Sequence, residues 1–149
     1  MRPHPDASEY KGARDERNAG KNRSQKILAA DSKRPLLNVT MDHSKTDYIN
    51  AVYVDGFRKP NAFLVTQMPL CETMDDFWEM VASSGSKTVV TLGPLPDQNP
   101  SRMLKQFHCP TWRRLERVPG SHDIVLDMLR RVDTWQMLAE GAPVIVQCL

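Results

Sequence analysis

The residue best placed to do chemistry in this sequence is Cys148, which follows the apolar run 144–146 and Gln147. In sheets with helices on their faces, reacting groups gather at the carboxyl ends of strands. A thiol there becomes a nucleophile when a following loop and helix direct amide groups toward it and lower its pKa. Free cysteine is more often simply buried, so the residue pattern by itself favours a buried structural thiol.

Two other groups of side chains have the types needed for chemistry. Asp47, Tyr48 and Asn50 form a polar cluster, but at a strand edge such residues more often fix a turn or satisfy backbone groups. His108 and Cys109 supply half of a metal site, and no second pair at ligand spacing accompanies them. We therefore interpret the first group as structural and expect neither a metal nor another cofactor.

The charged residues and the cysteines narrow the class of protein. The 20 basic and 18 acidic side chains nearly balance, which argues against an extended nucleic-acid surface. Arg113, Arg114 and Arg117 form the densest basic patch and would suit an acidic partner or a phosphate, but the neighbouring Glu116 favours a solvated loop. Three cysteines without a CxxC pair indicate reduced thiols rather than a disulfide framework.

Length and hydropathy predict one soluble domain. A chain of 149 residues has room for a single core of ordinary size. No apolar run approaches the ~20 residues that a membrane span needs, and the first residues carry no apolar stretch of the kind found in secretory signals. We therefore expect no membrane segment in this chain and a cytoplasmic location.

Short β-rich runs predict several strands. Residues 48–54 and 62–67 read as two strands joined by a turn, and residues 88–92 and 144–146 as buried strands. We interpret residues 93–100, with three prolines, as a loop in which regular structure stops.

Two amphipathic segments predict helices. The first runs from Thr73 to about Gly85, with Asp76 as the acidic half of a capping box, and the second runs from Ser121 to Gly141. Residues 1–21 read as a polar lead-in that is loosely held. Alternating strands and helices predict an α/β or α+β fold, a sheet flanked by helices.

Several segments together resemble the protein tyrosine phosphatase domain, and in detail the second, membrane-distal domain of receptor-type phosphatases of the mu and kappa kind. The resemblance covers residues 22–149, and the order and spacing of its motifs follow the family. The motifs are Lys21-Asn22-Arg23, Asp47-Tyr48-Ile49-Asn50-Ala51, Thr66-Gln67-Met68-Pro69-Leu70, Asp76-Phe77-Trp78, Gln106-Phe107 through Trp112, and the strand before Cys148.

The resemblance makes Cys148 the position of the nucleophile and Arg23 part of the substrate-binding segment, yet several positions depart from the family pattern. Ser24 stands where the family has a tyrosine that stacks on the phosphotyrosine ring, and Arg114 stands where it has the aspartate that protonates the leaving group. Arginine cannot donate that proton because its pKa stays above about 12. Gln147 replaces the histidine before the nucleophile.

The family pattern also predicts that this domain is incomplete. The phosphate-binding loop and its arginine would follow Cys148, so we expect the cradle to be missing after Leu149. Between Pro100 and Ser101 the family has a long stretch with several strands, so we expect the sheet to lack its middle. Arg23 and Arg34 are expected to remain as solvent-facing charges.

These features favour a phosphatase-family domain that is catalytically inactive as written and has a regulatory or docking role. Its partners would be phosphotyrosine proteins or a neighbouring phosphatase domain, on the cytoplasmic side of the plasma membrane if it is part of a receptor. One alternative is an active phosphatase that hydrolyses phosphotyrosine through a cysteinyl-phosphate and whose sequence here is a fragment. Another is a chain that does not form a stable domain.

Overall fold

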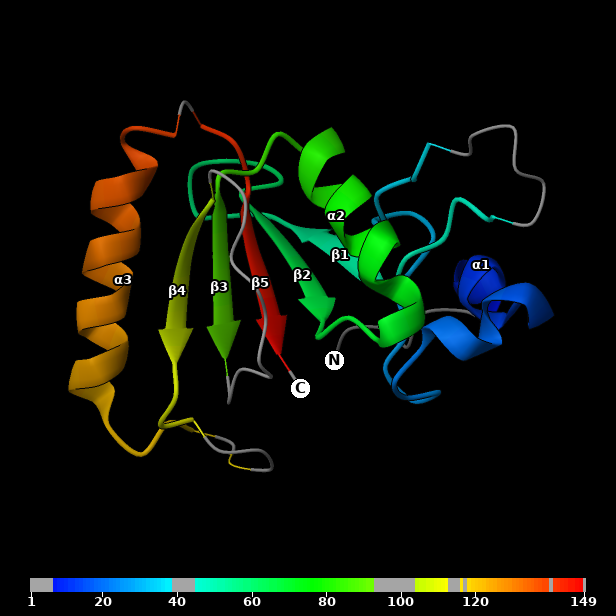
Figure 1. The fold of residues 1–149 in the computed structure, drawn as a ribbon, viewed down its shortest axis with the longest axis horizontal. Coiled ribbons are helices and arrows are strands. Elements are labelled where there is room, and N and C mark those ends of the chain that lie inside the picture. Colours follow the sequence, from blue (N-terminus) through cyan, green and yellow to red (C-terminus); the bar gives the residue numbers. More distant parts are fainter. Residues whose placement is uncertain are drawn as a thin grey trace.

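A computed structural model describes residues 7–38, 45–92, 104–112, 116, 118–139 and 141–148. Within these ranges the main elements are five strands and two helices of ten or more residues, with short helical turns near the N-terminus (Figure 1). In chain order the elements are η1 (Ala7–Tyr10), α1 (Lys11–Arg14), η2 (Glu16–Lys21), β1 (Ala51–Val54), β2 (Phe63–Gln67), η3 (Cys71–Thr73), α2 (Met74–Ser83), β3 (Thr88–Leu92), β4 (Lys105–Cys109), α3 (His122–Gln136) and β5 (Val144–Cys148).

The strands form one mixed sheet in the order β1-β2-β5-β3-β4. β1 runs antiparallel to β2, and the other neighbouring pairs are parallel. The central strand β5 pairs Ile145 with Leu64 of β2 and with Val89 of β3. The expectation that the sheet lacks its middle is therefore wrong, because β5 joins the two halves into one continuous sheet. The α/β class with a mixed sheet is confirmed.

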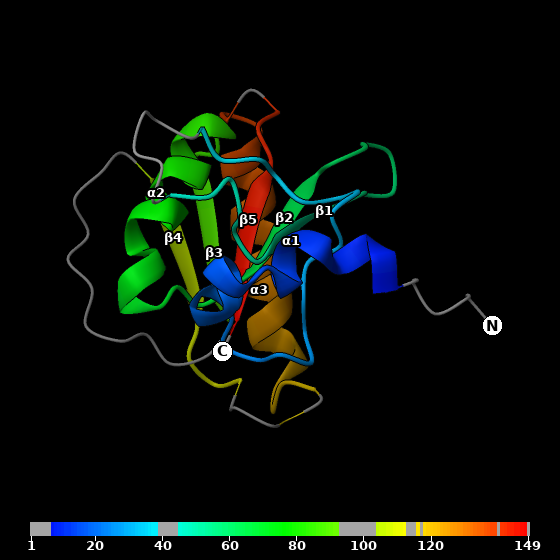
Figure 2. The same cartoon turned by 90° about the vertical axis from the view of Figure 1, so that its right-hand side faces the viewer.

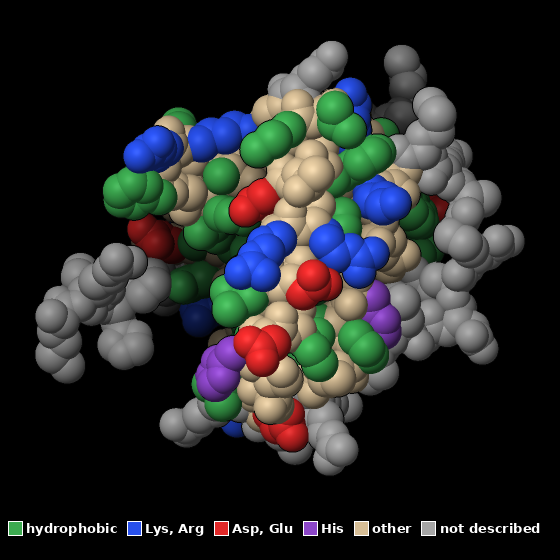
Figure 3. Space-filling view, turned by 90° about the vertical axis from the view of Figure 1, so that its left-hand side faces the viewer, with side chains coloured by type: hydrophobic (Ala, Val, Ile, Leu, Met, Phe, Trp, Pro, Cys, Tyr) green, Lys and Arg blue, Asp and Glu red, His purple; other side chains and the backbone are tan. Residues whose placement is uncertain are grey.

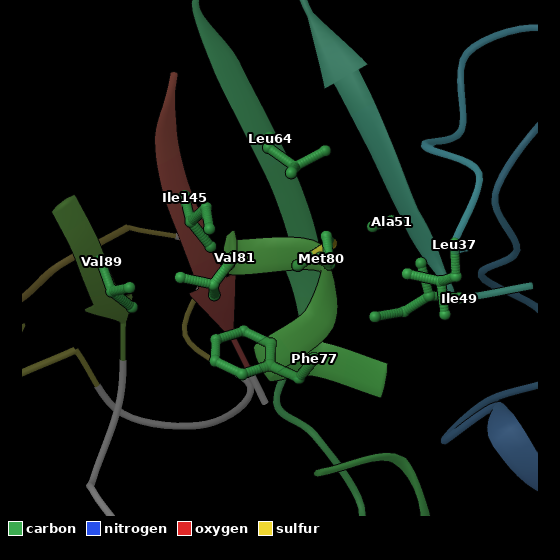
Figure 4. Packing of buried hydrophobic residues seen from close by; sticks show 9 residues of the cluster. All are labelled: Leu37, Ile49, Ala51, Leu64, Phe77, Met80, Val81, Val89 and Ile145. Carbon is green, nitrogen blue, oxygen red and sulfur yellow. The ribbon is translucent and has the colours of Figure 1, made fainter. Parts of the chain in front are cut away.

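Helix α2 covers one face of the sheet. Its Phe77, Met80 and Val81 are buried against Leu64 and Ile145, which point toward the helix from β2 and β5 (Figure 4). In Figure 2 this helix lies to the left of β5 and β2. The side chains at 3.6-residue spacing thus bury one stripe of α2, as its sequence pattern predicts.

Helix α3 packs on side chains that alternate with the first set. Met128 and Val132 of α3 contact a cluster with Val90, Phe107 and Val144. Because successive residues of a strand point to opposite faces, Val90 and Val144 belong to the face opposite Val89 and Ile145. The helix ends at Gln136 rather than at Gly141; one further turn follows, and Gly141 has a positive φ of 77° in that turn.

Three details of local structure differ from the expectations. Strand β4 was not predicted, and it pairs in parallel with β3. Thr73 makes no side-chain cap on α2; its hydroxyl accepts a hydrogen bond from the Leu70 N–H (2.9 Å), so the predicted capping box is wrong. Asp76 instead accepts from Lys21 Nζ at 2.8 Å.

The N-terminal turns are packed rather than loosely held. Ala13 is fully buried and Asn18 nearly so, and the Asn18 side chain donates to the Gly12 carbonyl. The Gly12 N–H in turn donates to the carboxylate of Asp31 at 3.1 Å. Figures 1 and 2 place these turns beside β1, at the end of the molecule opposite α3. Long-range polar contacts therefore order a segment whose composition alone indicates little structure.

Candidate functional site

The carboxyl ends of three parallel strands meet at Cys148. Its register partners are Gln67 at the end of β2 and Leu92 at the end of β3. Cys148 is a free thiol and is exposed, so its interpretation as a buried structural thiol is wrong. A free thiol at this position is accessible to a molecule that approaches the carboxyl ends of the parallel strands.

Gln147, directly before Cys148, is anchored on the opposite face of the sheet. It is buried, and its Nε2 donates to Thr91 Oγ1 at 2.7 Å. The same hydroxyl accepts from Gln106 Nε2 at 3.2 Å, while Gln147 Oε1 is buried without a hydrogen-bond partner among the described residues. Gln147 thus joins β5 to β3 through a neutral amide that points away from the thiol.

Arg23 is connected to Cys148 by hydrogen bonds through the backbone of Met68. Its Nε donates to the Met68 carbonyl at 2.7 Å and its Nη2 to the Pro69 carbonyl at 3.1 Å. The Met68 N–H donates to the Cys148 carbonyl at 2.7 Å. The structure therefore brings the Arg23 segment to the strand that ends in Cys148. Arg23 is exposed, as expected, but its guanidinium is not a free point charge, because two of its nitrogens already donate to carbonyl oxygens.

Gln67 connects the chain segments that lie near the carboxyl end of β5. This role was not predicted from the sequence. Its Oε1 accepts from the Arg23 N–H at 3.0 Å and from Asn50 Nδ2 at 3.1 Å, and its Nε2 donates to the Lys21 carbonyl at 2.8 Å. Asn50 also donates to the Ile27 carbonyl at 3.0 Å. The signal for Gln67 was its place at the end of a predicted strand, within a family motif.

Of the remaining predicted site residues, Ser24 is described by the structure and three arginines are not. Ser24 is half-buried, and its hydroxyl accepts from the Lys26 N–H at 3.2 Å. Its side chain thus serves a local turn beside Arg23. Arg114 and the basic residues Arg113 and Arg117 lie outside the described residues.

Tyr48 and its neighbours are structural, as predicted. Tyr48 is fully buried, and its hydroxyl donates to Asn22 Oδ1 at 2.6 Å. Burial raises the pKa of Tyr48 to about 12, and the hydrogen bond with Asn22 partly opposes the shift. Arg34 lies 5.7 Å from the centre of the Tyr48 ring and pairs with Asp31 (3.1 Å) and Asp47 (3.3 Å). With its side chain largely buried, Arg34 is not a solvent-facing charge.

The fold separates the two residues considered as half of a metal site. His108 and Cys109 are consecutive in β4, so their side chains leave opposite faces of the sheet. Across the described ranges, no group of three His, Cys, Asp or Glu side chains is placed to hold a metal ion. Within the same ranges, no helix has the length and apolar character to cross a membrane.

Comparisons with known proteins agree on one family. The family described as protein-tyrosine phosphatase matches residues 18–100 and 95–149. Receptor-type tyrosine-protein phosphatase F of Mus musculus is 42% identical over 90 residues, which is 60% of this chain and 5% of that protein. The human phosphatase F is 44% identical over 82 residues, 55% of this chain and 4% of that protein, and the Lar-like phosphatase of Caenorhabditis elegans is 43% identical with the same coverage. This chain thus spans a small part of the curated relatives that it matches.

Proposed function

The chain belongs to the protein-tyrosine phosphatase family, and on that premise we propose that it is a domain without efficient phosphatase activity that has a regulatory or docking role. The relatives are receptor-type phosphatases. The finer assignment to a second domain of the mu or kappa kind, over residues 22–149, rests on the motifs of the sequence. The location that goes with it is the cytoplasmic side of the plasma membrane.

The observation that carries the proposal is that the side chains of the segments around Cys148 are either neutral or already engaged in hydrogen bonds. Gln147 is an amide held by Thr91, and it cannot carry the positive charge that a neighbouring imidazolium would offer a thiolate. The Arg23 guanidinium donates to two carbonyls, and the Ser24 hydroxyl has no ring on which a phosphotyrosine could stack. Nucleophile activation and ring binding are both weakened.

The general acid is the third proposed loss. Arg114 stands where the resemblance implies an aspartate, and a guanidinium stays protonated throughout the useful pH range. Losing proton donation to the leaving group costs roughly 10² to 10⁴ in rate. Partners that suit such a domain are phosphotyrosine proteins or a neighbouring phosphatase domain.

A phosphatase assay on the purified protein tests the proposal. We expect turnover of p-nitrophenyl phosphate to be far below that of an active family member and unchanged by Cys148→Ser. Turnover close to that of the active member, and lost in Cys148→Ser, would overturn the proposal. The triple variant Ser24→Tyr, Arg114→Asp, Gln147→His tests whether these positions limit the rate.

One observation favours the alternative, an active phosphatase of which this sequence is a fragment. Cys148 is exposed at the strand end where catalysis is expected, and the family matches in two stretches that meet at residues 95–100. Sequencing of full-length transcripts separates the two proposals. An arginine-containing glycine loop after Cys148 and a longer segment near residue 100 would support the alternative, although Ser24 and Arg114 would still predict weak activity.

A further inference from the structure

A groove lies between β4 and α3, on a part of the molecule that the proposed function does not use. It has a volume of about 330 Å³ and is lined mainly by Lys105 and Phe107 of β4, Arg130, Arg131 and Trp135 of α3, and Leu138. Phe107 is nearly buried and belongs to the core cluster under α3. We call this surface the β4/α3 groove; its apolar floor is continuous with the core.

The rim of the β4/α3 groove is positively charged. Lys105 Nζ lies 5.8 Å from the centre of the Trp135 ring, and Arg131 reaches Asp127 only at 4.0 Å, with both side chains 68% exposed. An ion pair of that length and exposure is weak. No carboxylate of the described residues pairs with Lys105 or Arg130. Figure 3 looks onto this side of the molecule, where basic and acidic side chains lie among hydrophobic ones.

The strand beside the groove is at the edge of the sheet. Among the described strands, β4 pairs only with β3, so its other side presents backbone groups to a new strand. An added strand would lie about 4.8 Å from β4 with every second side chain on the α3 face. Lys105 and Phe107 occupy that face of β4, next to the cations of α3.

We propose that the β4/α3 groove binds an acidic peptide in extended conformation, which adds a strand to the free edge of β4. Acidic side chains at alternate positions would face Lys105, Arg130 and Arg131 on the α3 side of the sheet. The side chains between them would point to the opposite face. Charge complementarity favours an acidic peptide over a second copy of the chain. A copy docked through the same surface would place its own Lys105, Arg130 and Arg131 against these three cations.

Fluorescence anisotropy with a labelled peptide tests the charge and the groove. The probe is a peptide of about nine residues alternating glutamate and valine, and a lysine–valine peptide is its control. We expect saturable binding of the acidic peptide, weakened by salt, and none of the basic one. The variant Arg130→Ala/Arg131→Ala should weaken binding about fivefold to tenfold. The charge-matched control Lys26→Ala/Arg58→Ala, at exposed positions outside the groove, should change it less than about twofold.

Equal binding of the two peptides, or an unchanged affinity in the Arg130/Arg131 variant, would overturn the proposal. Amide hydrogen exchange tests strand addition: protection in residues 105–109 should rise when the acidic peptide binds, and a change confined to α3 would overturn this part. Sedimentation is the third readout, since a dimer that the peptide displaces would assign the edge to a second copy. The outcome is separate from the phosphatase assay, because Cys148→Ser should leave peptide binding unchanged.

Discussion

The two faces of the sheet differ in how completely the chain covers them. On the α2 side, Met80 is fully buried, and the loop residues Leu37 and Ile49 close the cluster from the flank. On the α3 side, only Met128 and Val132 of the fifteen helix residues are buried. One side is sealed by segments distant in sequence, and the other is covered by a single helix.

Because of this difference, we expect the α2 side to contribute more to stability and the α3 side to offer the surface for binding. The α2 side holds buried polar contacts, such as Lys21 with Asp76, that tolerate little change. The α3 side keeps Leu126 and Leu129 about half exposed and has a charged groove at the sheet edge. Substitutions of buried residues should therefore cost more stability on the α2 side than on the α3 side, and substitutions of exposed groove residues should report on binding.

The largest expected effect compares the same substitution on the two sides. Met80→Ala should lower the free energy of unfolding by about 4–5 kcal/mol and Met128→Ala by about 2–3 kcal/mol. The enclosed site at Met80 cannot collapse around the cavity, whereas α3 is held on one side only and can shift. Urea unfolding followed by circular dichroism measures both. Equal losses would mean that the two sides are sealed alike.

The next effect concerns the Lys21–Asp76 ion pair at the start of α2. Asp76→Asn should cost about 1–3 kcal/mol, because Lys21 loses its carboxylate and keeps only the Thr46 hydroxyl and the Tyr48 carbonyl. Asp75→Asn is the matched control, since Asp75 shares the first helical turn but is exposed. Urea unfolding of the two variants side by side measures the difference. A similar loss in both would assign the effect to the helix dipole rather than to the ion pair.

Tyr48, on the α2 side, makes the free energy of unfolding depend on pH. Its pKa is raised from 10.0 to about 12 in the folded protein, so the folded state keeps a proton that the unfolded state loses. The contribution of the protonated Tyr48 to the free energy of unfolding is therefore complete below pH 10 and is lost as the pH rises toward 12. Tyr48→Phe should remove this dependence and cost about 1 kcal/mol at pH 7. Thermal melts between pH 8 and pH 12 would check it, with Tyr53→Phe, whose side chain is less buried, as the control.

The smallest effect is expected on the outer surface of α3. Leu129→Glu should change the free energy of unfolding by no more than about 0.5 kcal/mol, because the side chain is already half exposed. A loss above about 1 kcal/mol in urea unfolding would show that the Leu129 side chain is buried by other parts of the chain. The two faces of the sheet would then not differ in how completely they are covered.

The sequence predicted those elements whose signal is local. Both longer helices and the strands at 88–92 and 144–148 have periodic or β-branched runs, and they form near the expected places. Strand β4 was missed because its residues, Lys-Gln-Phe-His-Cys, contain no β-branched side chain, and its pairing with β3 supplies the order. The Thr73–Asp76 box failed because Lys21, far away in the sequence, takes the carboxylate.

The candidate site was predictable only in part. The position of Cys148 at a strand end follows from the apolar run before it, whereas its exposure depends on how β2 and β3 end beside it. The contact of Arg23 with the carbonyls of Met68 and Pro69 spans more than forty residues and has no local signal. Composition therefore indicated the residues, and only the tertiary contacts showed which of them are already occupied.

The central place of β5 has a consequence for how the chain acquires its structure. Phe63 and Thr88 both pair with Val144, so neither half of the sheet can join the other before the ribosome has released that late segment. Until then, β2 and β3 present unpaired edges and apolar faces, the condition in which nascent chains associate wrongly. Folding should accordingly be slow for a chain of this size, because its key contacts are far apart in sequence. Chaperones that shield such edges would act before β5 arrives.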